Sequence, residues 1–262
     1  TETATETATE TETVAELEDT SPDLPDLDVG PDLPPDTDTA PDPEPPAELV
    51  AWYAFEHPDA PQVQDTSLYG HHGNPSLGVT RGVEGRWGFG LRFDGDKSHV
   101  QVPYTPDHDL QPPLTLMVWL YLDSPVTTNR MLIRKLLQYQ LSISIVPEPD
   151  LVEFYSQPLD FTRSDTPIDW ARWVHVAATY DGAQVQFFVD GLLESSKPVT
   201  GAFPSNTQPL HLGGDGLNEG TAPLGAIDEV KIWSVVRTPE EICLDGGGAW
   251  NIAAPVPCEF GP

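Results

Sequence analysis

The sequence predicts an all-β domain that follows a disordered acidic segment, and three observations predict this fold class. Short apolar runs separated by turn residues recur between residues 49 and 235, which is typical of a β-sandwich or barrel. One pair of such runs, at residues 173–191, has the pattern of a β-hairpin. The composition also changes near residue 48, and all seven tryptophans lie after that point.

Residues 1–48 have the composition of a disordered stalk. They hold 16 of the 42 acidic residues, none of the 12 basic residues and 9 of the 29 prolines. Such a segment cannot bury enough apolar surface to offset its ordering entropy, and interleaved proline favours an extended backbone. We therefore predict an extended stalk over residues 1–48 that holds a domain, residues 49–262, away from a surface. An incidental disordered terminus is the alternative.

The first predicted strands of the domain are LVAWYAF (49–55), FGLRF (89–93) and HVQV (99–102). LTLMVWLYL (114–122) is apolar at nearly every position, so this strand is expected to be covered on both faces. Further strands are predicted at residues 131–135, 139–146, 151–156, 210–214 and 224–235.

The hairpin at residues 173–191 is the strongest local signal. Its apolar residues alternate, which places one set of side chains on a buried face. Asp181-Gly182 separates the two runs, and glycine tolerates the positive φ that tight hairpin turns require. After the last predicted strand, Thr238-Pro239-Glu240-Glu241 combines a capping residue, proline at the first helical position and a glutamate three residues after the cap. This pattern predicts one short C-terminal helix.

Two cysteines, Cys243 and Cys258, lie near the C-terminus. They lack CxxC spacing, and metal sites built on cysteine need more ligands than two. A disulfide is therefore favoured over two free thiols. Closing this loop with a disulfide would stabilise the folded state by about 3 kcal/mol. A disulfide would also indicate an oxidising compartment.

The net charge of −30 excludes the classes of protein that bind anionic polymers. Nucleic-acid binding needs cationic side chains against phosphates, and Arg134-Lys135 is the only basic pair that stands out. Anionic membrane surfaces are disfavoured for the same reason. The sequence also contains no apolar run of about 20 residues, the length that spans a bilayer. The first residue is Thr1 and not Met, which favours a product whose signal peptide is removed and is compatible with a lipid anchor upstream of residue 1, as in a bacterial lipoprotein.

Five segments in chain order carry a family resemblance: WYAF with DTSLYGHHGN, then GFGLRFDGDKSHVQVP, LTLMVWLYL, WVHVAATYDGAQVQFFVDG and LGAIDEVKIWSVVRTPEEI. Together they resemble the LamG-like jelly-roll domains of the concanavalin A-like lectin/glucanase superfamily. The resemblance covers about residues 49–245 and implies a two-sheet antiparallel jelly-roll sandwich.

The resemblance also implies a structural calcium ion. In many members of the superfamily this ion is bound by the turn after an early strand and by an acid on the closing strand. The matching positions here are Asp94, Gly95 and Asp228, and calcium prefers such oxygen ligands. The alternative is that Asp94 is only a turn residue and that Asp228 only caps a sheet edge.

No catalytic residues are predicted. The endo-β-glucanases of the same superfamily carry an E-x-D-x-x-E run, whose carboxylates lie about 5 Å apart. This sequence lacks that run, because Glu153 is isolated and the adjacent Asp228 and Glu229 face opposite sides of a strand. GxSxG and HExxH motifs are also missing from the sequence.

Glycan binding requires accessible aromatic faces beside polar side chains. The candidates are Tyr104, Tyr139, Tyr155, Phe161 and Trp170, although aromatic residues in a sandwich are usually in the core. Tyr104 and Trp170 lie at predicted strand ends, so we predict these two as ligand-binding residues. Four tryptophans within strand patterns are expected in the core: Trp52, Trp119, Trp173 and Trp233.

We therefore expect a noncatalytic recognition module, extracellular or at the cell surface, that binds a glycan or a surface protein. The binding role follows from analogy with the family, because one fold can host unrelated functions. Two alternatives remain: a divergent glycoside hydrolase, and a structural or adhesive envelope protein without a small ligand.

Overall fold

The computed structural model describes residues 45–261, so nearly all of the predicted stalk, residues 1–48, lies outside the described residues and stays a prediction. The elements are β1 (Leu49–Tyr53), β2 (Asn74–Pro75), β3 (Thr80–Glu84), β4 (Phe89–Asp94), β5 (His99–Val102), the 3₁₀ helix η1 (Pro106–His108), β6 (Leu114–Leu122), β7 (Arg130–Lys135), β8 (Tyr139–Ser144), β9 (Leu151–Ser156), β10 (Asp160–Arg163), β11 (Trp173–Tyr180), β12 (Gln184–Val189), β13 (Leu192–Pro198), β14 (Leu210–Gly213), β15 (Leu224–Trp233), α1 (Pro239–Asp245), β16 (Ala249–Trp250) and β17 (Cys258–Glu259).

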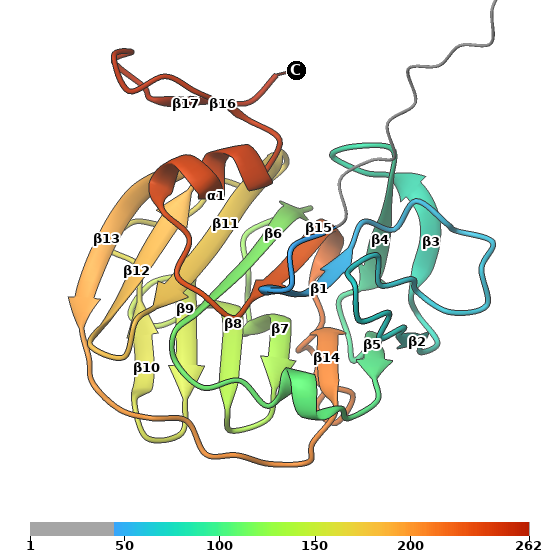
Figure 1. Cartoon of the computed structure of the whole chain (residues 1–262). Coiled ribbons are helices and arrows are strands. Elements are labelled where there is room, and N and C mark those ends of the chain that lie inside the picture. Colours follow the sequence, from blue (N-terminus) through green and yellow to red (C-terminus); the bar gives the residue numbers. More distant parts are fainter. Residues whose placement is uncertain (1–44, 262) are drawn as a thin grey trace, which may run out of the picture. The chain divides into compact units, whose positions relative to one another are not determined.

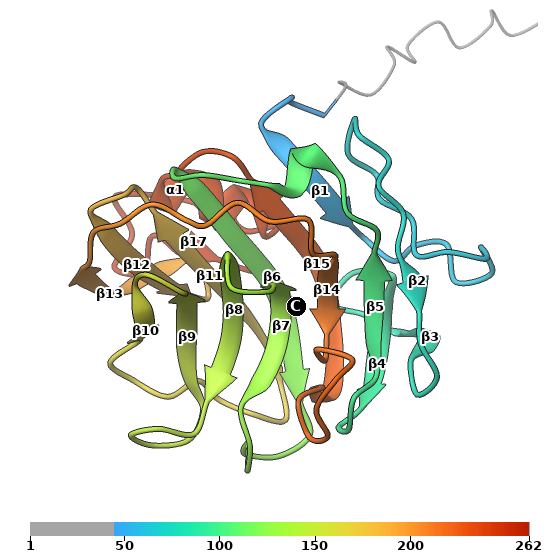
Figure 2. The same ribbon diagram turned by 90° about the horizontal axis from the view of Figure 1, so that it is seen from below.

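Two antiparallel sheets pack face to face, as the resemblance implies (Figures 1 and 2). The eight-stranded sheet has the order β13-β12-β11-β6-β15-β4-β3, and β1 pairs with the C-terminal half of β15. The seven-stranded sheet has the order β10-β9-β8-β7-β14-β5-β2. The jelly-roll sandwich is thus confirmed. No helix within residues 45–261 is long and apolar enough to cross a membrane.

The core lies between the two sheets and is supplied by alternate strand residues. Leu116, Val118 and Leu120 of β6 point inward and join a cluster that includes Leu141 and Phe154 of the opposite sheet. Burying each such side chain stabilises the fold by about 1.5–3 kcal/mol.

The other face of β6 is also covered, which explains its uninterrupted apolar sequence. Met117 packs with Phe188, Trp233 and Ile242 in a second cluster, and Ile242 belongs to α1. The helix therefore covers part of the outer face of the eight-stranded sheet (Figure 1).

The predicted hairpin forms as β11 and β12. Gly182 has φ of +97°, and the Asp181 carboxylate accepts hydrogen bonds from the backbone N–H groups of Ala183 and Gln184, both at 2.8 Å. Asp190 and Gly191 both have positive φ, which is the geometry of a tight primed turn. This second turn leads into β13, a strand that the sequence analysis did not predict.

The C-terminal helix α1 begins as predicted, with a capping box between Thr238 and Glu241. Cys243 in this helix forms a disulfide with Cys258, as the sequence led us to expect. The bond fastens residues 249–261, here called the C-terminal strap, to α1. The strap contains the short pair β16–β17.

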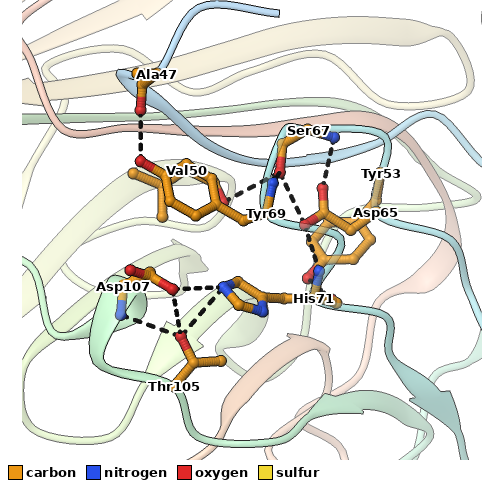
Figure 3. Close-up of polar contacts among 9 residues, drawn as sticks. All are labelled: Ala47, Val50, Tyr53, Asp65, Ser67, Tyr69, His71, Thr105 and Asp107. Carbon is orange, nitrogen blue, oxygen red and sulfur yellow. Dashed lines mark hydrogen bonds and ion pairs between the residues drawn. The ribbon is translucent and has the colours of Figure 1, made fainter.

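The loop after β1 is organised by one buried carboxylate. Asp65 accepts hydrogen bonds from the backbone N–H groups of Ser67 and His71 at 2.9 and 2.8 Å (Figure 3). It also accepts one from the backbone N–H of Trp52 at 2.9 Å. His71 in turn bonds Asp107 of η1 through Nε2 at 2.8 Å. The DTSLYGHH segment therefore joins two distant parts of the chain.

The unpredicted strands lie at sheet edges. β3, β10 and β13 each pair with one strand of their sheet, and the β3 sequence TRGVE is exposed or half-buried throughout. Edge strands need little apolar sequence because one side faces solvent. Their sequences consequently lack the alternation that indicates a strand.

Candidate functional site

The outer face of the seven-stranded sheet carries a row of polar and aromatic side chains. Their chain neighbours, such as Val100, Leu141 and Phe154, point into the core, so the row itself points outward. Adjacent members are register partners from strand to strand. In order across the sheet they are Gln101 on β5, His211 on β14, Arg134 on β7, Gln140 on β8, Tyr155 on β9 and Phe161 on β10.

A pocket of about 220 Å³ lies at one end of this row, with Gln101, Arg134, His211 and Asp215 among its lining residues. Asp215 follows β14 and accepts a hydrogen bond from Arg134 Nη1 at 2.7 Å. Burial opposes ionisation of Asp215, but hydrogen bonds from Asn218 and the charge of Arg134 outweigh it and hold its pKa well below the usual range. Arg134 and Asp215 are therefore fixed as an ion pair.

His211 is the central member of the pocket. Burial, followed by the charges of His99 and Arg134, lowers its pKa to about 4, against the opposing charge of Asp215. The imidazole is therefore neutral at pH 7 and presents one donor and one acceptor. Its ring meets His99 edge-on, with centroids 5.1 Å apart.

The other end of the row is an aromatic platform. Tyr155 and Phe161 stack with ring centroids 4.5 Å apart, and Phe161 is 46% exposed. Arg163 lies over Phe161, with 5.3 Å from the guanidinium carbon to the ring centroid. Arg163 also pairs with the buried Glu153 at 2.8 Å. These contacts hold the platform in place.

This arrangement fits a hydroxyl-rich ligand. Fixed donors and acceptors at one end suit hydroxyl groups, and the aromatic faces at the other end suit apolar ring faces. From β5 to β10 the row crosses five strand spacings, or about 24 Å. It is long enough for an extended chain of several ring units.

Two acids on this face are held by arginines of different strands. Glu153 lies on β9 and pairs with Arg163 of β10, whereas Asp215 pairs with Arg134 of β7.

The structure does not bring the two predicted ligand-binding residues together. Tyr104 is 39% exposed and lies beside Lys135 at the C-terminal end of β7, with 4.9 Å from Nζ to the ring centroid. Trp170 is 49% exposed, and the next residue, Ala171, donates a backbone hydrogen bond to Leu122. The two residues are accessible, as expected, but they lie at opposite ends of the sandwich.

The three predicted calcium ligands are also separated. Asp94 pairs in register with Leu224 of β15, so Asp228 lies four positions, or about 13 Å, further along that strand. The Gly95 carbonyl accepts a hydrogen bond from Arg130 Nη1 at 2.7 Å, which places a positive charge where a cation would bind. The three residues do not fit one ion in this arrangement.

Sequence reasoning named Tyr155 and Phe161 as candidates but preferred Tyr104 and Trp170, and it missed His211, Arg134 and Asp215. The polar residues of YQLSIS, which alternate with apolar ones, are a signal of this outer face. The expectations about tryptophans hold in part. Trp119 and Trp233 are buried, as expected. Trp52 and Trp173 are only half-buried, and Trp173 lines a pocket on the outward side of the eight-stranded sheet.

Comparison with known proteins identifies the family. A family described as the concanavalin A-like lectin/glucanases superfamily matches residues 94–243. Pappalysin-1 of Mus musculus is 38% identical over 103 residues, and pappalysin-1 of Homo sapiens is 37% identical over the same length. These matches cover 35% of this chain but only 6% of each relative.

Solved structures share the fold at low sequence identity. Domain 4 of the arabinanase AbnA from Geobacillus stearothermophilus, solved with arabinotriose, has a TM-score of 0.60 at 18% identity over 74% of this chain and 96% of that one. The binding domain of Paraclostridial Mosquitocidal Protein 1 has a TM-score of 0.59 at 14% identity over 76% and 52%. Trypanosoma rangeli sialidase has a TM-score of 0.57 at 16% identity over 76% and 32%.

Proposed function

We propose, since the chain belongs to the concanavalin A-like lectin/glucanases superfamily, that it is a noncatalytic recognition module. Its ligand is a glycan, which binds along the outer face of the seven-stranded sheet. The sugar rings pack on Tyr155 and Phe161, and hydroxyl groups bond to His211, Arg134 and Asp215.

One observation carries this proposal: an exposed aromatic stack and a polar pocket lie in a single register row. Aromatic faces bury the apolar sides of sugars, and the neutral His211 reads hydroxyls as donor and acceptor. The arabinanase domain solved with arabinotriose shares this fold, which supports a carbohydrate-related role.

A noncatalytic role is favoured over a glycoside hydrolase by the two acids of this face. A general acid needs a proton at working pH, so its pKa must be raised. The pKa of Asp215 is lowered, because the hydrogen bonds of Asn218 and the charge of Arg134 outweigh burial. Glu153 is engaged by Arg163 and by Ser142 Oγ, which donates to it at 3.0 Å.

We also propose that the domain acts outside the cell or at its surface. The Cys243–Cys258 disulfide suits an oxidising compartment. The acidic, proline-rich segment before the domain would hold the binding face away from its point of attachment. A surface protein that carries the glycan is the natural partner.

A glycan array probed with the full chain tests the proposal. We expect Phe161→Ala to reduce binding about five-fold, since stacking of an aromatic ring contributes about 1 kcal/mol. Phe89→Ala is the matched control, because Phe89 is also exposed, at 41%, but belongs to the other sheet. If Phe161→Ala retained binding and Trp170→Ala lost it, the binding site would lie instead at the loop before β11, which contains Trp170. A folded chain that binds no glycan would favour an adhesive protein without a small ligand.

A further inference from the structure

A second pocket lies on the opposite side of the molecule, between the eight-stranded sheet and the C-terminal strap. Its volume is about 570 Å³. Trp119 and Trp173 of the sheet form one wall, Phe260 of the strap forms another, and Arg86 of the β3–β4 turn lines it as well. Arg172 and Asp190 line the pocket too, and they pair with each other at 2.8 Å. Three aromatic rings, two guanidiniums and one carboxylate therefore border the pocket, and Arg86 is the guanidinium that no carboxylate in the described part of the chain neutralises.

The aromatic walls are packed in fixed positions. Phe260 meets Trp119 edge-on, with ring centroids 4.7 Å apart. Trp119 Nε1 donates a hydrogen bond to the carbonyl of Gly246 at 3.0 Å. The Cys243–Cys258 disulfide holds the strap two residues before Phe260. The pocket is consequently built from sheet and strap together.

Arg86 is the unusual member of this pocket. Its guanidinium carbon lies 4.3 Å from the ring centroid of Trp87 and 4.9 Å from that of Trp119. One of its Nη atoms donates to the Gly261 carbonyl. Its Nε is buried and has no hydrogen-bond partner, and within residues 45–261 no carboxylate pairs with it. Among the residues that the structure describes, Arg81 and Arg130 also bond to backbone carbonyls and not to carboxylates, so what distinguishes Arg86 is that its unpaired charge lines a pocket.

The turn that carries Arg86 is itself anchored. Asp228 accepts a hydrogen bond from the backbone N–H of Trp87 at 3.0 Å, although Asp228 is fully buried. A buried carboxylate is costly unless hydrogen bonds satisfy it. Asp228 therefore holds the β3–β4 turn, and with it Arg86, against the sheet.

The chemistry of these walls defines a ligand class. A guanidinium binds a carboxylate through two parallel hydrogen bonds, and indole faces accept the apolar faces of sugar rings. The volume lies in the range of about 300–1,000 Å³ that is typical of small-molecule sites. We propose that this pocket binds a carboxylate-bearing sugar, with its carboxylate on Arg86 and its ring against the half-buried Trp173. This pocket lies on the eight-stranded sheet, whereas the proposed glycan face lies on the seven-stranded sheet. An experiment can therefore refute either proposal without refuting the other.

The test titrates the full chain with glucuronate, glucose and benzoate and follows the indole N–H signals of Trp119 and Trp173 by NMR. Glucuronate should shift both signals and should bind at least about ten-fold more tightly than glucose. Glucose has no carboxylate, so it cannot form the charged hydrogen bonds with Arg86. Arg86→Gln should remove this preference. Arg92→Gln is the matched control, because Arg92 lies on the same sheet and is paired with Asp123.

A second variant keeps the test independent of Arg86. Val256→Trp should fill the pocket from the strap, at a position that is 48% exposed, and should abolish glucuronate binding without unfolding the chain. Equal affinity for glucuronate and glucose would overturn the proposal. So would benzoate binding as tightly as glucuronate, or undiminished binding in both folded variants.

Discussion

At the residue scale, Asp228 shows how one side chain can have a structural role that its sequence position does not reveal. It is fully buried and accepts backbone N–H groups from Trp87 and Glu229 at 3.0 and 2.7 Å. Burial raises its pKa to about 7, although the hydrogen bonds from Trp87 and Glu229 act in the opposite direction. The closing strand therefore carries an acid that supports a turn.

This raised pKa predicts a pH dependence of stability. The folded state binds the Asp228 proton up to about pH 7, whereas the unfolded state releases it near pH 3.8. The free energy of unfolding should therefore fall as pH rises through this window, by on the order of 4 kcal/mol. In urea unfolding, the Asp228→Asn variant should not show this decrease of the unfolding free energy with rising pH, since asparagine does not ionise.

The opposite sign is expected for Asp94→Asn, the matched control on the neighbouring strand. Burial raises the pKa of Asp94, but the hydrogen bond from Ser98 and those from the backbone outweigh burial and lower this pKa below its usual value. Its contribution to stability is present above the unfolded pKa and is lost as pH falls. Identical pH profiles for the wild type and Asp228→Asn would contradict the assignment of Asp228.

At the scale of elements, the C-terminal strap depends on its disulfide. Its short pair β16–β17 joins only two residues on each side, which is too little for independent stability. The bond spans 15 residues, a loop whose closure is worth about 3 kcal/mol. The double variant Cys243→Ala/Cys258→Ala should lose about that much unfolding free energy in urea.

A reducing agent is the control, because it should destabilise the wild type and leave the double variant unchanged. If the wild type and the double variant had the same unfolding free energy, packing alone would hold the strap.

The same scale shows what the sequence could and could not predict. β6, the β11–β12 hairpin and α1 were predictable because their signals are local: an apolar run, an Asp-Gly turn and a capping box. The edge strand β3 was not, because an edge needs few apolar residues. The polar pocket was not predictable either, since His211 and Arg134 meet only through strand pairing between β14 and β7.

At the scale of the whole molecule, the charge of −30 leads to a prediction about cations. A specific ion stabilises the folded state by mass action, but Asp94, Gly95 and Asp228 do not converge on one point. We expect calcium and magnesium at equal concentration to raise Tm equally, by reducing charge repulsion. Melting curves with each ion and with a chelator measure this. A rise specific to calcium, abolished by Asp228→Ala, would restore the site predicted from the sequence.

The row on the seven-stranded sheet draws on three separate stretches of chain: residues 99–102, 130–163 and 210–213. During synthesis the stacked rings emerge well before His211, which is inserted between β5 and β7 only when β14 arrives. A nascent or truncated chain thus carries only half of the surface proposed to bind a glycan. Capacity to bind the proposed ligand would then report that β14, the last interior strand of the seven-stranded sheet, has docked.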